Sequence, residues 1–200
     1  ICSLNEGVDR LTLSVIMEIN KNGDVMKHKV LESVINSNKR LVYDDVSDYI
    51  ESGFKDHSES IEGLLDEVQL MNELKEILYD KRQRRGSINF DFPETKITLN
   101  EDGVPIDISK EERRVANQII EEFMLITNET VAEEYFWAEI PFLYRIHEEP
   151  SSEKITTFAR FVHNLGYNLK GKEVHPKELQ LLIEEIKGKK EETVISTLLL

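Results

Sequence analysis

Four residues with side chains suited to binding sugars and phosphates recur at helical spacing in the middle of the chain. They are Arg114, Asn117, Glu121 and Asn128. At about 100° per residue they fall on one side of a predicted helix, opposite an apolar side. Arginine binds phosphate oxygens, and asparagine and glutamate bond hydroxyl groups. The residues alone leave two interpretations open, a binding stripe and an ordinary solvated helix surface, and periodicity favours the second.

Three aspartates with DDxxD spacing form the sharpest acidic cluster. They are Asp44, Asp45 and Asp48, at the start of a predicted helix over residues 44–51. Such carboxylates could hold Mg²⁺ and a diphosphate, as in prenyl-diphosphate synthases. Those enzymes are largely helical, however, and no second aspartate-rich motif occurs. Stabilisation of a helix N-terminus is therefore the favoured interpretation, and a Mg²⁺-diphosphate enzyme is a lesser alternative.

Phe90 and Phe92 flank Asp91 just before Pro93 and share one side of a predicted strand. Aromatic rings near the basic run at residues 81–85 could stack bases, although such a pair usually belongs to a core. The five histidines show no metal-ligand spacing, and the chain has no glycine-rich phosphate loop. The residues thus predict no metal site and no nucleophile.

Hydrophobic periodicity predicts an α+β fold that is mostly helical with two β-hairpins. The first hairpin joins strands 11–19 and 25–35 through a type I′ turn at Asn22-Gly23. The second joins residues 87–99 to 104–108. Predicted helices cover residues 44–51, 61–84, 110–136, 153–164, 176–186 and a last one from about 191. Ser109 and Glu112 are expected to form the capping box of the 110–136 helix, and residues 142–146 a strand.

Acidic residues outnumber basic ones by 39 to 25, which gives a net charge of −14. This balance counts against a surface that binds nucleic acid broadly, because phosphate contacts need lysine and arginine. Local basic clusters, among them Lys110 with Arg113 and Arg114, leave room for a narrow binding channel. No apolar run is long enough to span a membrane, and the single cysteine suits the cytoplasm.

Several stretches, in this order along the chain, are similar to the ribonuclease R/ribonuclease II (RNB) family. They are ICSLNEGVDRLTLSVIMEI, SVINSNKRLVYDDV, RRGSINFDFPE, ERRVANQIIEEFMLITNETVAE, FLYRIHEEP and ISTLLL. The resemblance covers essentially the whole chain, and the ordered succession is more specific than any single stretch. One departure is Glu6, where the family usually has proline.

The resemblance implies part of a 3′→5′ exoribonuclease that hydrolyses single-stranded RNA processively to nucleoside 5′-monophosphates. It implies that two Mg²⁺ ions in the full-length enzyme are held by aspartates upstream of Ile1, and that a catalytic arginine lies downstream of Leu200. Tyr43 and Glu121 match family residues that read the ribose, and Phe90 matches an aromatic residue that clamps the bases at the 3′ end. Arg114 and Asn117 match no specific family residue, and we expect them to contact RNA only because they share the polar stripe with Glu121.

The chain starts without methionine and ends on an apolar run, Leu198 to Leu200. We therefore expect residues 1–200 to be one partial RNB catalytic domain, truncated at both ends, inactive alone and without a metal ion. Its expected partners are the 3′ end of single-stranded RNA and the rest of the parent protein, including its RNA-binding domains. A non-catalytic RNA-binding or assembly module remains the alternative.

Overall fold

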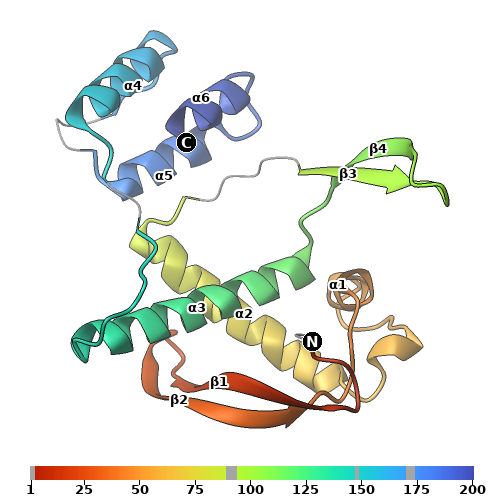
Figure 1. Ribbon diagram of the computed structural model, residues 1–200. Helices are drawn as coiled ribbons and strands as arrows, with labels where there is room; N and C mark the ends of the chain where they lie inside the picture. Colours follow the sequence, from red (N-terminus) through yellow and green to blue (C-terminus); the bar gives the residue numbers. More distant parts are fainter. Residues whose placement is uncertain (1–2, 89–93, 147–148, 170–173) are drawn as a thin grey trace. The chain divides into compact units, whose positions relative to one another are not determined.

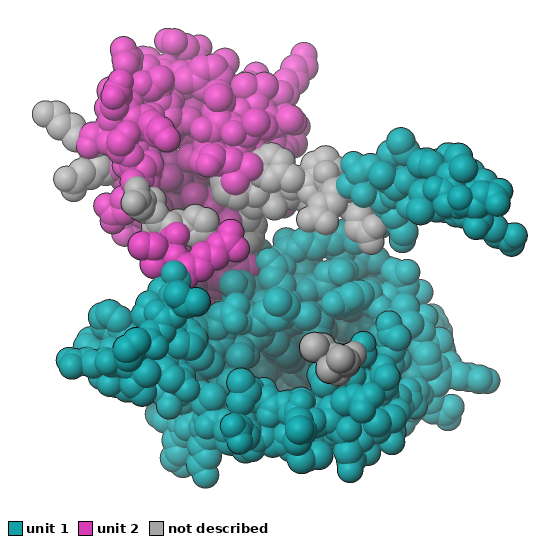
Figure 2. All heavy atoms as spheres, in the orientation of Figure 1, with its two compact units in different colours: residues 1–80, 94–144 teal, residues 81–93, 145–200 magenta. Residues whose placement is uncertain are grey.

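The computed structural model describes residues 3–88, 94–146, 149–169 and 174–200. Its contacts divide the chain into two compact units, each discussed here by itself (Figure 2). Unit 1 comprises Ile1–Asp80 and Glu94–Tyr144, and unit 2 comprises Lys81–Pro93 and Arg145–Leu200. The described residues contain six α-helices and two β-hairpins, which confirms the predicted α+β class (Figure 1).

The first hairpin pairs β1 (Asp9–Ile19) with β2 (Val25–Asn36) in antiparallel register, as predicted. The prediction of a type I′ turn was wrong. Such a turn needs a positive φ at both central residues, and here only Gly23 has one, +84°. The side-chain oxygen of Asn20 accepts bonds from the backbone N–H groups of Asn22 (2.8 Å) and Asp24 (3.0 Å). These bonds hold a three-residue loop with glycine at its left-handed position, and the register of the two strands shifts between Glu18 and Ile19.

The second hairpin, β3 (Glu94–Leu99) and β4 (Pro105–Glu111), uses the same turn. Asn100 Oδ1 accepts from the N–H groups of Asp102 (3.0 Å) and Val104 (2.8 Å), and Gly103 has φ +77°. Because β4 continues through residue 111, the predicted capping box of Ser109 and Glu112 was wrong. Ser109 instead pairs with Lys96 across the hairpin.

Helix α3 (Val115–Trp137) therefore begins five residues later than predicted. Asn117 Oδ1 accepts from the backbone N–H of Arg114 at 3.2 Å, which satisfies one donor at the helix start. The Ser47 hydroxyl, fully buried on α1 (Tyr43–Glu51), accepts from the N–H of Ala116 at 3.2 Å. Side chains from two elements thus replace the capping box that the local sequence suggested.

Helix α2 (Leu65–Arg85) follows a short 3₁₀ turn, η1 (Glu59–Ile61). It begins four residues after the predicted start, because Gly63 takes φ +82°, outside the helical region. It ends at Gly86, as predicted, with φ +96°. Four apolar residues recur on this helix at intervals of three and four, which predicts that they face the core: Val68, Met71, Leu74 and Leu78. None of them is exposed, and Val68 and Leu78 are buried.

The core of unit 1 lies where α1, η1, α2 and α3 meet. It contains Val46, Tyr49, Ile61, Val68 and Ala116, each less than one-tenth exposed. The Tyr49 hydroxyl accepts from Gln69 Nε2 at 2.8 Å, so that the buried ring keeps its polar end paired. Apolar burial and these few polar bonds fix α1 against both longer helices.

An arginine and three carboxylates add a second connection between α1 and α3. Arg114 Nη2 lies 2.6 Å from both Asp48 Oδ1 and Glu51 Oε2, and its Nη1 lies 3.4 Å from Asp44 Oδ1. Residues 44, 48 and 51 are spaced by four and three, which places their carboxylates on one face of α1. We call these four residues the Arg114 clamp.

Unit 2 is built from α4 (Ser152–Asn164), α5 (Pro176–Ile186) and α6 (Glu192–Leu199), which match the predicted helices. Its core residues are Phe158, Val162, Tyr167, Leu179, Leu182, Ile186 and Ile195. Gln180 Nε2 donates to Gln83 Oε1 at 2.7 Å, which ties α5 to the last turn of α2.

The predicted strand over residues 142–146 was wrong, since this segment of the described chain has no regular structure. Its aromatic residues instead turn back on the end of α3, where Phe142 stacks on Tyr135 with ring centroids 4.8 Å apart. None of the helices in the described ranges combines the length and apolar character that a membrane span requires.

We predict that Arg114→Ala lowers the urea midpoint for unfolding, because it leaves three carboxylates facing one another. Added salt should restore part of the loss by screening their repulsion. Arg114→Lys should recover only part of it, since an ammonium lacks the guanidinium fork. Lys27→Ala, which breaks the exposed Lys27–Glu18 pair, is the matched control and should change little. Equal midpoints for Arg114→Ala and this control, measured by circular dichroism, would contradict the prediction.

Candidate nucleic-acid interface

Four of the five residues predicted to contact RNA lie near the N-termini of α1 and α3, in unit 1. Tyr43 is the first residue of α1, Arg114 immediately precedes α3, and Asn117 and Glu121 lie on its first two turns. The contact between Asp44 and Arg114 brings these two helix ends together. The fifth, Phe90, lies outside the described residues.

The ring of Tyr43 is available to a ligand. It is 51% exposed, and its hydroxyl bonds no group in the described part of the chain. Its backbone is nevertheless held, since the next residue, Asp44, belongs to the Arg114 clamp. A free aromatic ring on an anchored backbone is suited to packing against a sugar or a base.

Arg114 is engaged within the protein. Its hydrogen bonds to Glu51, first, and to Asp48 raise the pKa of its guanidinium above the ordinary value. A guanidinium that already neutralises neighbouring carboxylates has little left to offer a phosphate, and the carboxylates themselves repel one. The side-chain oxygen of Asn117 likewise already accepts a hydrogen bond, from the backbone N–H of Arg114 at the start of α3. Both side chains have structural partners that the sequence did not reveal.

Glu121 has a partner that was not predicted, Arg113. Arg113 Nε lies 3.0 Å from Glu121 Oε2, and Nη2 contacts the same oxygen. Their side chains are 38% and 42% exposed. A helix starting at residue 110 would separate these residues by about 12 Å along its axis. The pair forms because Arg113 lies before the helix, in a segment that the periodicity had wrongly predicted to be helical.

The apolar side predicted for α3 is only partly correct. Ala116 and Ile119 are buried, but Met124 is 60% exposed and Glu122 is buried. Asn128, the last member of the predicted polar stripe, is exposed. The stripe is thus a set of individually partnered residues at its N-terminal end, not a continuous open surface.

The DDxxD aspartates face protein groups. Asp44 and Asp48 belong to the Arg114 clamp, and Asp45 accepts a hydrogen bond from the Ser60 hydroxyl. Within the described ranges, no group of three or more histidine, cysteine, aspartate or glutamate side chains is arranged to hold a metal ion. A cationic guanidinium occupies the position that a metal would need beside Asp44 and Asp48.

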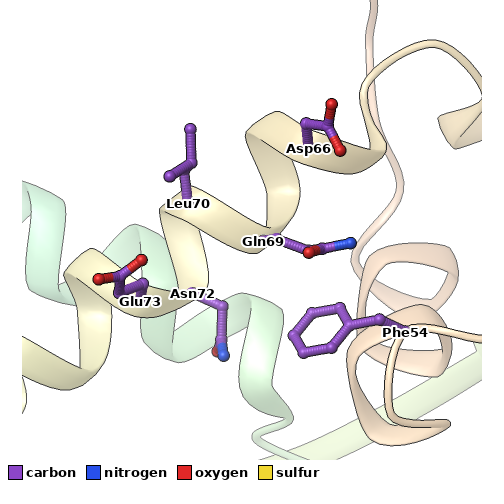
Figure 3. Close-up of a pocket in the computed structure, with 6 residues that line it drawn as sticks. All are labelled: Phe54, Asp66, Gln69, Leu70, Asn72 and Glu73. Atoms are coloured by element: carbon purple, nitrogen blue, oxygen red, sulfur yellow. The ribbon is translucent and has the colours of Figure 1, made fainter.

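A separate pocket of about 480 Å³ opens between the segment after α1 and the first half of α2 (Figure 3). It is lined by Phe54, Asp66, Gln69, Leu70, Asn72 and Glu73. None of the predicted RNA contacts belongs to it. Two carboxylates at its wall would repel a phosphate backbone, so the pocket is a poor site for RNA.

Comparison with known proteins gives one consistent result. The family model described as RNB domain matches residues 1–200. Ribonuclease R 1 of Lactococcus lactis is 41% identical over 202 residues, covering 100% of this chain and 25% of that protein. Ribonuclease R of Thermotoga maritima is 42% identical over 191 residues, covering 94% of this chain and 26% of that protein.

Solved structures agree in fold. Mycoplasma genitalium RNase R in complex with ribose-methylated single-stranded RNA superposes with a TM-score of 0.90 at 25% identity, covering 100% of this chain and 31% of that one. Its complex with double-stranded RNA gives a TM-score of 0.91 at 25% identity, with 100% and 35% covered. Yeast Ssd1, a pseudonuclease, shares the fold at a TM-score of 0.67 and 21% identity, covering 98% of this chain and 23% of its own.

The chain spans about a quarter of the length of the curated relatives it matches. The resemblance first noted in scattered sequence stretches therefore holds over the whole length, in sequence and in fold. This chain belongs to the RNB domain family, as a homologue of part of ribonuclease R.

Proposed function

We propose that residues 1–200 form part of the catalytic domain of a cytoplasmic exoribonuclease that degrades single-stranded RNA processively from its 3′ end to nucleoside 5′-monophosphates. The observation that carries this proposal is the RNB match over the whole chain, together with relatives named ribonuclease R. One solved relative of the same fold, Mycoplasma genitalium RNase R, is in complex with single-stranded RNA in one structure and with double-stranded RNA in another.

Within that enzyme, this chain handles the substrate. Tyr43 and Glu121 read the ribose near the 3′ end, and Phe90 stacks on a terminal base. The free hydroxyl and exposed ring of Tyr43 support its role, as does the partial exposure of Glu121. Arg114 and Asn117 already bond groups of the protein, and these contacts favour a role in positioning α1 and α3 over direct contact with RNA.

The described residues do not fit a Mg²⁺ site, because the clustered aspartates already bond Arg114 and Ser60. On this proposal the metal is held by other residues of the parent protein. Apolar side chains on both hairpins, such as Leu11 at 88% exposure and Ile108 at 70%, support contact with the rest of that protein.

The fold alone does not decide whether the parent cleaves RNA, since a pseudonuclease shares it. The alternative is therefore a protein that binds RNA without hydrolysing it. Incubation of the full-length parent with Mg²⁺ and uniformly labelled single-stranded RNA separates the two: mononucleotide release supports the exoribonuclease, and retention of intact RNA supports the alternative.

We predict that the isolated 200-residue chain releases no mononucleotides under conditions in which the parent does, because no group of three or more histidine, cysteine, aspartate or glutamate side chains in its described ranges is arranged to hold a metal ion. The measurement is product formation by chromatography at matched protein concentration, with folding checked by circular dichroism. Release of mononucleotides by the pure, folded chain would show that it carries catalytic groups of its own.

We predict that Glu121→Ala in the parent reduces the preference for RNA over DNA of the same sequence. A hydrogen bond to a charged carboxylate contributes about 1.5–3 kcal/mol, and only RNA offers the 2′-hydroxyl. Competition binding of the two oligonucleotides, without divalent cations, measures the change. Glu129→Ala, an exposed glutamate further along α3, serves as the control. An unchanged preference in Glu121→Ala would remove this residue from ribose recognition.

We predict that Phe90→Ala weakens binding of both RNA and DNA 3′ ends by about 1–3 kcal/mol, as expected for loss of one stacked base. Phe90→Tyr should retain most of the affinity, because it keeps the aromatic face. Equilibrium titration with a fluorescent oligonucleotide measures both variants. Equal affinity of Phe90→Ala and the unmodified parent would rule out base stacking by Phe90.

A further inference from the structure

Two donor nitrogens of the Arg113 guanidinium contact the same carboxylate oxygen. A guanidinium paired with a carboxylate is often bidentate, with one N–H for each oxygen. Here Nε, at 3.0 Å, and Nη2 both contact the same oxygen, Glu121 Oε2. No described residue bonds the other oxygen, Oε1.

This arrangement fixes the carboxylate of Glu121 and leaves one oxygen as an open acceptor. Two donors on one oxygen restrain rotation about the last bonds of the side chain, which a single contact would not. The pair is partly exposed, so a ligand hydroxyl can approach it. A sugar hydroxyl is a donor of the kind that a fixed carboxylate oxygen accepts.

Arg113 lies between β4, which ends at Glu111, and Arg114, whose side chain bonds Asp48 and Glu51 of α1. Its backbone is therefore held on the C-terminal side by the Arg114 clamp. The restraint on Glu121 comes from outside its own helix.

We propose that Arg113 is a positioning residue for sugar recognition: it holds Glu121 so that Oε1 meets the 2′-hydroxyl of a bound ribonucleotide. The proposal rests on the role of Glu121 given above. It assigns Arg113 no direct contact with RNA. An arginine that binds phosphate would raise the affinity for RNA and for DNA equally. Arg113 instead changes only the ratio of the two affinities.

The experiment uses the full-length parent and an oligoadenylate with its 2′-deoxy counterpart, without divalent cations. The variants are Arg113→Lys, which keeps the charge but not the fork, Arg113→Gln, and Glu121→Ala. Lys27→Gln, which breaks the exposed Lys27–Glu18 pair in the same unit, is the control. We expect both Arg113 variants to reduce the RNA-to-DNA affinity ratio by about 3- to 10-fold, the range of one net hydrogen bond. In the Glu121→Ala background, Arg113→Gln should change the ratio no further.

Three results would overturn the proposal. If RNA and DNA affinities fall together at a constant ratio, Arg113 contacts phosphate, and the slope of log affinity against log salt should drop by about one. If the Arg113 variants behave as Lys27→Gln does, the pair is only a surface ion pair. If Glu121→Ala itself leaves the ratio unchanged, the role of Glu121 fails, and that of Arg113 with it. Circular dichroism of each variant excludes loss of folding as the cause.

Discussion

The contact of Arg114 with Asp44, Asp48 and Glu51 sets how α1 and α3 meet, and every predicted sugar-binding feature of unit 1 lies close to that junction. Tyr43 stands one residue before Asp44, and Arg113 one residue before Arg114. Apolar burial of Val46, Tyr49 and Ala116 draws the helices together without fixing direction. The guanidinium fork supplies direction, since its donors reach carboxylates spaced along one face of α1.

The Arg114 clamp also bears on how an acidic chain can belong to a protein that we propose to act on RNA. Three carboxylates near a proposed sugar site would repel phosphate, and the single guanidinium offsets part of their charge. The remaining negative charge disfavours close approach of the backbone at this point. Recognition through hydroxyl acceptors and an aromatic ring depends less on positive potential than phosphate binding does. Local chemistry of this kind is compatible with a net charge of −14.

Sequence predicted the elements whose signals are local. The β1–β2 pair and helices α4 and α5 came from periodicity, glycine and proline, which act within a few residues. The start of α3 was wrong, because β4 continues through Ser109 and the helix is capped from α1 by Ser47, which is distant in the chain. The same error concealed the contact between Arg113 and Glu121. Arg114 was assigned to phosphate because its partners, more than sixty residues away, leave no trace in its local pattern.

The two hairpins show why local and distant information differ in kind. Both turns follow the pattern Asn-x-x-Gly, and in both the asparagine oxygen accepts two backbone N–H bonds. That geometry needs nothing outside five residues, so it recurs wherever the pattern does. A binding site needs side chains from several elements. Here it depends on which carboxylates contact Arg114, and on which Glu121 oxygen remains an open acceptor after Arg113 has bonded the other. Family membership therefore identifies the candidates, while the contacts of each side chain separate those free to meet a ligand from those already used.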